Sequence, residues 1–105
     1  MKVLKFAEPL PRLILNGQKS TTWRITDYQL SVGDRISLCD NNGQEFARAM
    51  VAGVKQTTFA NLTEEDKKGH EKYQSAEEMY EVFSKYYDRK VVPETRLFVI
   101  KFKLL

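Results

Sequence analysis

Alternation of hydrophobic and polar residues predicts β-strands along much of this chain. Strand-like runs cover residues 3–6, 20–25, 35–39, 44–58 and 96–104. The run at 44–58 is long for one strand, and Gly53 in its middle predicts a bulge of the kind that bends a small barrel. The last run is mostly apolar on both faces, so we expect it to lie in the middle of the sheet. Together these runs predict a barrel-like sheet.

Three segments between the strands carry helix signals. Residues 10–16 form a short helical pattern that a glycine ends. Residues 62–68 combine a threonine N-cap with acidic residues, which favour the positive end of a helix dipole. Ser75-Ala-Glu-Glu78 has the pattern of a capping box, and the helix that it begins extends to about Tyr87. We interpret the aromatic stripe of this helix as core packing rather than as a platform for nucleic-acid bases.

The run at 20–25 has two different faces. Thr21, Trp23 and Ile25 point to one side of the strand, while Thr22 and Arg24 point to the other. We expect the first face to be core and the second to be polar. Because the chain shows no repeat, low-complexity segment or linker, it is predicted to form a single domain of the α+β class over residues 1–105, with helices packed against the sheet.

The charge and hydropathy of the chain indicate where the protein is located and what it binds. Seventeen Lys and Arg residues against fourteen Asp and Glu residues give a net charge of +3, which would assist a polyanionic ligand without requiring one. No apolar run approaches the roughly 20 residues of a membrane helix, and the first residues lack the apolar core of a secretory signal. We therefore expect a cytoplasmic monomer with no membrane partner.

Cys39 and His70 are the only cysteine and the only histidine. With one residue of each type, the chain cannot form an internal disulfide or a zinc site of Cys and His ligands. No metal and no cofactor are therefore expected. Cys39 lies in a strand-like run and is interpreted as a small core residue. His70 lies in a highly charged segment, so neither a Cys-His nor a Ser-His-Asp site is expected.

The densest group of residues able to do chemistry is Gly17-Gln-Lys-Ser-Thr-Thr-Trp-Arg24. A glycine allows the backbone to approach a ligand closely, and Lys19 and Arg24 can bind an oxyanion or a phosphate. Thr22 presents a hydroxyl on the same strand face as Arg24. The alternative interpretation is a solvated strand edge that follows a helix ended by Gly17.

Five segments, in this order, resemble the ASCH domain, which has a PUA-like fold. They are Ile14-Leu15; Gly17, Lys19, Thr22 and Arg24; Gly33-Asp34; Glu71, Tyr73, Ser75, Glu77 and Glu78; and Phe98-Val-Ile-Lys-Phe102. The resemblance covers nearly the whole chain. It implies a small, partly open β-barrel with helices packed against it and a cleft between them, of the kind that handles RNA or modified nucleosides.

Small single-domain members of that family include N4-acetylcytidine amidohydrolases. The resemblance therefore implies an enzyme that removes the acetyl group from N4-acetylcytidine or a related acylated nucleoside. Carried over to matching positions, its catalytic residues are Lys19, Thr22 and Glu71. Glu64, Glu65 and Asp66 are nearby alternatives for the carboxylate. Residues considered for substrate binding are Arg24, Gly17, Trp23 and Tyr73, although Trp23 and Tyr73 are also suited to core packing.

Amide hydrolysis gives these three residues distinct tasks. Thr22 offers a nucleophile or a group that orients water, and Lys19 is either a base, if burial lowers its pKa, or an oxyanion donor. Glu71 can carry a proton to the leaving nitrogen, and Arg24 can bind the substrate carbonyl or hold Glu71.

Two other functions stay open at the level of sequence. The first is a non-catalytic RNA-binding module, with Arg89, Lys90 and Arg96 as phosphate contacts. The second is RNA cleavage that uses the same Lys and Glu as an acid–base pair. A catalyst predicts Lys19 partly buried within a few ångströms of Glu71, whereas a pure binder predicts both side chains solvated beside a continuous basic groove.

Overall fold

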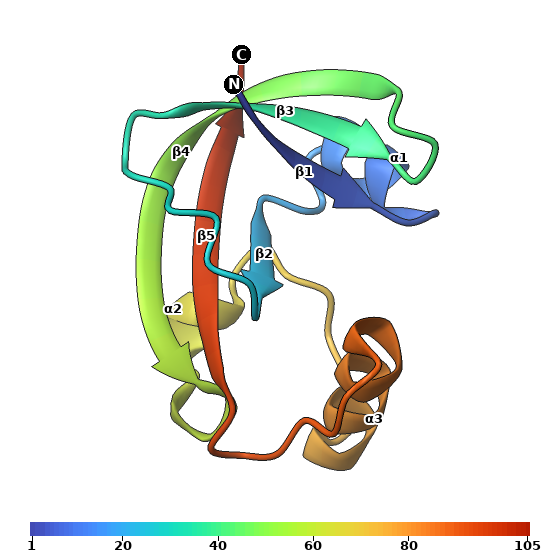
Figure 1. The fold of residues 1–105 in the computed structure, drawn as a ribbon, viewed down its shortest axis with the longest axis vertical. Coiled ribbons are helices and arrows are strands. Elements are labelled where there is room, and N and C mark those ends of the chain that lie inside the picture. The colour runs from blue at the N-terminus through green and yellow to red at the C-terminus, as the bar shows by residue number, and fades with distance from the viewer.

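The computed structural model describes all 105 residues, and its five strands form one mixed sheet (Figure 1). The elements are β1 (Lys2–Phe6), α1 (Leu10–Leu15), β2 (Thr21–Arg24), β3 (Arg35–Asp40), β4 (Glu45–Thr58), a 3₁₀ turn (Phe59–Asn61), α2 (Glu64–Lys67), α3 (Ala76–Tyr87) and β5 (Arg96–Leu104). All five predicted strands and all three predicted helices are present, which confirms the α+β class.

The sheet curls into a half-barrel that stays open between its two edge strands. The strand order is β1-β3-β4-β5-β2, with β1 parallel to β3 and the other pairs antiparallel. β5 lies between β4 and β2, so the prediction of an interior strand is confirmed. The β4–β5 register shifts between Val51 and Gly53, which confirms the predicted irregularity at Gly53. Strand pairing does not close the barrel, because β1 and β2 are not paired with each other.

Two hydrophobic cores lie on opposite faces of β5. Ile100 and Phe102 belong to one core with residues of β1, β3 and β4. Leu97 and Val99 belong to the other, which α3 covers with Met79 and Phe83. Because successive residues of a strand point to opposite faces, this arrangement explains why residues 97–100 of β5 are all apolar. No helix of the structure is long and apolar enough to cross a membrane.

The structure confirms the predicted cap of α2 and one half of the predicted cap of α3. Thr63 accepts from the backbone N–H of Asp66, and the Asp66 carboxylate accepts from the backbone N–H of Thr63, which is a reciprocal capping box at α2. At α3, Ser75 accepts from the N–H of Glu78, but the Glu78 carboxylate accepts from Gln74 instead of from Ser75. The capping box predicted at Ser75 is therefore wrong in its second half.

Cys39 is buried, as predicted for a core residue. β2 has the predicted core face and polar face, but the residues of both faces are buried. The alternative of a solvated strand edge at Thr22 and Arg24 is therefore wrong. The physical reason is the position of β2 at the mouth of the half-barrel, where its polar face meets the end of β1.

Candidate active site

Lys19 lies in the loop between α1 and β2, and its side chain is only 2% exposed. Gly17 ends α1 with a positive φ of 85° and turns the chain, after which the backbone N–H of Lys19 donates to the carbonyl of Leu13. The Lys19 ammonium donates to the carbonyl of Thr21 at 2.7 Å and to Oε2 of Glu71 at 2.5 Å. A buried ammonium with two acceptors is held in one place.

Glu71 reaches Lys19 because the segment before it is docked on the start of β2. The backbone N–H groups of Ser20 and Thr21 both donate to the carbonyl of Gly69, and the Thr21 hydroxyl donates to the carbonyl of Lys68. Gly69 has a φ of 76°, and a Cβ at this position would lie 2.3 Å from the Ser20 hydroxyl. Only glycine combines this backbone conformation with so close an approach.

The ion pair between Lys19 and Glu71 is asymmetric in its exposure to solvent. The Glu71 side chain is 28% exposed, so its carboxylate faces both the buried lysine and the cavity. Burial lowers the pKa of Lys19, although the Glu71 carboxylate acts in the opposite direction. Burial also opposes the charge on Glu71, but the adjacent Lys19 charge holds the pKa of this carboxyl below its usual range. The Glu71 carboxylate is therefore ionised near pH 7 and faces the cavity.

Thr22 and Arg24 form a second polar unit beside the pair. Arg24 Nε donates to the Thr22 hydroxyl oxygen at 3.0 Å, and Nη2 donates to the carbonyl of Lys5 at 2.7 Å. The guanidinium also lies over the ring of Phe6, 4.7 Å from its centroid. Arg24 thus connects the two edge strands of the half-barrel. The expectation that Arg24 holds Glu71 is wrong, because the guanidinium is engaged by Thr22 and β1.

His70 is the main site residue that the sequence analysis missed. Its imidazole stacks on Trp23 with ring centroids 3.7 Å apart, and its Nδ1 donates to the carbonyl of Glu71 at 3.0 Å. The same nitrogen lies 3.5 Å from Glu71 Oε2. Burial, together with the charge of Lys19, lowers the pKa of His70 to about 4, so the ring is neutral near pH 7. Its only sequence signal is that it precedes Glu71.

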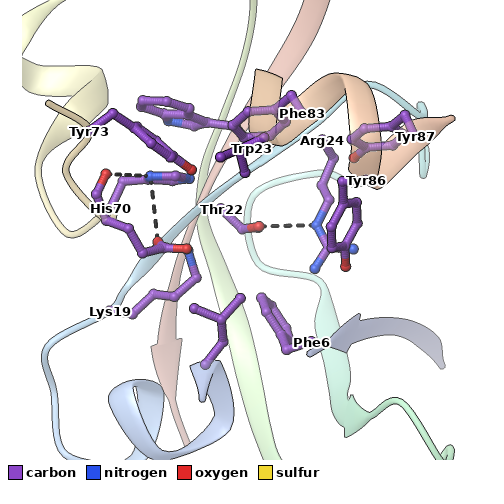
Figure 2. A pocket seen from close by; sticks show the side chains of 13 residues that line it. Phe6, Lys19, Thr22, Trp23, Arg24, His70, Tyr73, Phe83, Tyr86 and Tyr87 are labelled. Atoms are coloured by element: carbon purple, nitrogen blue, oxygen red, sulfur yellow. Dashed lines mark hydrogen bonds and ion pairs between the residues drawn. The ribbon is translucent and has the colours of Figure 1, made fainter. Parts of the chain in front are cut away.

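These groups surround a cavity of about 100 Å³. In Figure 2 the Thr22 hydroxyl lies between Lys19 and His70 on one side and Arg24 on the other, with Phe6 at one end and Trp23, Tyr73 and Phe83 at the other. The full lining is Phe6, Leu10, Lys19, Thr22, Trp23, Arg24, His70, Glu71, Tyr73, Val82, Phe83, Tyr86 and Tyr87. Most of the walls are apolar, which strengthens the electrostatic interactions inside.

The stripe of α3 consists of Met79, Phe83, Tyr86 and Tyr87, and its side chains lie partly in the core and partly at the cavity. Met79 and Phe83 are buried in the core, as predicted. Tyr87 accepts a hydrogen bond from the backbone of Ile25, and its burial raises its pKa. Tyr86 is 52% exposed and lines the cavity, so the core interpretation does not extend to it. Trp23 is buried and donates to the carbonyl of Asp66 while one face forms a wall of the cavity.

Several predicted residues lie away from the cavity. Gly17 is exposed and does not line it, so its part is to turn the chain toward Lys19. Arg89, Lys90 and Arg96 are exposed and line neither this cavity nor the larger pocket beside it. Among the alternative carboxylates, Glu64 and Glu65 are exposed on α2, and Asp66 pairs with Lys55. Glu71 is therefore the carboxylate that lies against Lys19.

Comparison with solved structures gives the fold a name. A protein from Enterococcus faecalis V583 described as DUF984 matches with a TM-score of 0.78 over 100% of this chain and 76% of its own, at 16% identity. An ASCH domain from Lactobacillus crispatus JV V101 matches with a TM-score of 0.67 over 90% of this chain and 69% of its own, at 15% identity. The chain has the ASCH fold.

A second ASCH structure, from Zymomonas mobilis, matches with a TM-score of 0.70 over 96% of this chain and 65% of its own, at 11% identity. No protein-family model matches the sequence, and no curated protein matches it. At sequence identities of 11 to 16%, these matches establish the fold of this chain and not its chemistry.

Proposed function

We propose that this protein is an amidohydrolase that removes the acetyl group from N4-acetylcytidine or a related acylated nucleoside. The observation that carries the proposal is the buried Lys19–Glu71 pair next to the Thr22 hydroxyl in a cavity with aromatic walls. A lysine 2% exposed and in contact with a carboxylate is what a catalyst requires, whereas a simple RNA-binding surface would leave both side chains solvated.

Thr22 is the nucleophile of the proposed reaction. Arg24 donates to the lone pairs of the Thr22 oxygen, which leaves the hydroxyl proton free to be given away. The positive guanidinium also favours negative charge on that oxygen. In the first step the Thr22 oxygen bonds to the acetyl carbonyl carbon, and its proton passes to Glu71, directly or through one water. Lys19 remains an ammonium and stabilises the oxyanion.

The tetrahedral intermediate then collapses. The bond from the carbonyl carbon to N4 breaks, and Glu71 returns the proton to N4 so that cytidine leaves as a neutral amine. A water molecule attacks the acetyl-Thr22 ester and gives a proton to Glu71. Glu71 passes this proton to the Thr22 oxygen as acetic acid departs, and the acid ionises to acetate in solution. The sum is N4-acetylcytidine and water converted to cytidine, acetate and a proton. The cycle uses only side chains that line the cavity.

Planar aromatic groups suit the base of the substrate. Trp23, His70 and Tyr73 lie along one side of the cavity, and Trp23 and His70 are already stacked in parallel. Burial and the Glu71 charge raise the pKa of Tyr73, so its hydroxyl keeps its proton and can donate to a carbonyl oxygen of the base. We place His70 as a positioning residue, because it contacts Glu71 rather than the reacting atoms.

The proposal is tested by incubating purified protein with N4-acetylcytidine and measuring products by chromatography. We expect cytidine and acetate in equal amounts from the wild type and none above background from a folded Lys19→Met variant. No product from either protein would overturn the proposal. Labelled RNA would then be the substrate to test for binding and cleavage.

A further inference from the structure

A second, larger pocket adjoins the cavity and has no part in the reaction described above. Its volume is about 670 Å³, against about 100 Å³ for the cavity that holds Lys19. The two share Trp23, Glu71 and Tyr73 as lining residues, so the Lys19–Glu71 pair lies where they meet. We call the larger pocket the outer groove; it lies between the 3₁₀ turn and α2 on one side and the start of α3 on the other.

Because the inner cavity and the outer groove differ in volume, they suit different parts of a substrate. Pockets for small-molecule ligands generally measure about 300 to 1,000 Å³, and a cavity of about 150 Å³ holds a molecule the size of benzene. The inner cavity therefore has room for the acyl group and the edge of a base, but not for a whole nucleoside. The rest of the substrate has to extend past Glu71, and the outer groove has the volume to receive it.

The lining of the outer groove combines charged and aromatic side chains. Lys67, Lys68 and Lys72 line it together with Tyr73 and Tyr80, and the carboxylates of Glu64 and Glu71 line it as well. Lysines bind phosphate, and tyrosine rings stack on bases or pack against ribose, which is the combination that binds single-stranded nucleic acids.

The charges of the groove leave one lysine unpaired. Lys67 and Lys68 each contact an exposed glutamate of α2 one turn away, and such surface pairs are weak. Lys72 makes no ion pair, and its neighbour Glu71 is already paired with Lys19. Lys72 is therefore the cation with its full charge available to an anion in the groove.

We propose that the outer groove binds the phosphate of a nucleotide, with Lys72 as its main contact. The substrate is then an N4-acylated cytidine that carries a phosphate, either a mononucleotide or one residue of a short RNA, rather than the uncharged nucleoside. The acyl part of this inference rests on the proposed function, whereas the phosphate site does not.

Binding measurements without turnover test the phosphate site. Dissociation constants are measured by calorimetry for cytidine, cytidine 5′-monophosphate and the dinucleotide CpC. We expect both phosphorylated ligands to bind wild-type protein roughly fivefold more tightly than cytidine. That advantage disappears in Lys72→Ala and persists in Lys103→Ala, an exposed lysine of β5 outside both pockets. A stronger effect for CpC than for the monophosphate identifies RNA as the source of the phosphate.

Equal affinity for cytidine and its monophosphate would overturn the inference, as would an advantage that survives Lys72→Ala. Hydrolysis assays on the acetylated nucleoside and its monophosphate keep the two proposals apart. Hydrolysis without any phosphate preference supports the proposed function and overturns the phosphate site. Phosphate-dependent binding without hydrolysis supports the phosphate site and overturns the proposed function.

Discussion

Lys19 and Glu71 are 52 residues apart in the chain, and their charged atoms lie 2.5 Å apart in the structure. The contact depends on two local features far from each other in sequence, the turn after α1 and the docking of Gly69 on the start of β2. The lysine is almost fully buried and the glutamate is partly exposed. The site is therefore built by tertiary structure, and its stability and its chemistry are linked.

Lys19 and Glu71 should be strongly coupled in their contributions to the free energy of unfolding. Removing one partner leaves a buried charge without compensation, so we expect Lys19→Met and Glu71→Gln each to lower the free energy of unfolding by about 3 kcal/mol. The double variant should lose much less than the sum, because neither charge remains. Urea unfolding of the four proteins measures the coupling, and additive losses would show that the pair is not formed.

Gly69 should be intolerant of any side chain. We expect Gly69→Ala to be destabilised by more than the roughly 1 to 2 kcal/mol of a left-handed alanine, because its Cβ would lie 2.3 Å from the Ser20 hydroxyl. Gly43→Ala is the matched control, since Gly43 has a φ of 81° and open space around it. Thermal unfolding compares the two variants. Equal losses would mean that the close approach at Gly69 is unimportant.

The Thr22 hydroxyl should matter for turnover more than for folding. Thr22→Val keeps the shape of the side chain and removes one acceptor from Arg24, which we expect to cost about 1 kcal/mol of stability. Activity should fall at least roughly 100-fold, whereas Thr22→Ser should keep a measurable part of it. Steady-state kinetics on N4-acetylcytidine provides the comparison. Near-normal kcat in Thr22→Val would exclude Thr22 as nucleophile.

His70 should make stability depend on pH below neutrality. Its pKa is about 4 in the folded protein against an ordinary value of 6.5, so between these values the unfolded chain binds a proton that the folded chain does not. The free energy of unfolding should therefore fall as the pH is lowered through this window, by up to roughly 3 kcal/mol. The charged groups that act on the ring are Lys19, Glu71 and Arg24.

The matched variant is His70→Phe, which retains an aromatic ring against Trp23. Denaturant unfolding at a series of pH values should give a shallower slope for this variant than for the wild type between about pH 6.5 and pH 5. Parallel slopes would show that His70 does not titrate as described. Steady-state kinetics of the same variant test the role of His70 in catalysis. A positioning role predicts a lower kcat with little change in KM.

Most of the fold could be predicted because its signals are local. Alternation along 44–58 and 96–104, and the threonine N-cap of α2, depend on residues within a few positions of one another. The second half of the cap at Ser75 was wrong because the Glu78 carboxylate accepts from the backbone N–H of Gln74 and not from that of Ser75. Such choices between close alternatives are not encoded in spacing.

The site was predictable only where a motif marked it. Lys19 and Glu71 do lie together, yet the burial of Arg24 and the position of His70 could not be predicted from their neighbours in sequence. Arg24 is buried because Thr22 and the end of β1 satisfy its donors, and His70 is buried because it stacks on Trp23. Both partnerships exist only after the half-barrel has formed, and a charged or polar residue alone predicts exposure.

The central claim is that the Lys19–Glu71 pair performs amide hydrolysis. Its most direct test is the rate of cytidine release from N4-acetylcytidine by the wild type and by the Lys19→Met, Glu71→Gln double variant, whose fold is expected to survive. We expect steady release by the wild type and only the uncatalysed rate with the folded double variant. Comparable rates from both proteins, or no cytidine from the wild type, would contradict the claim.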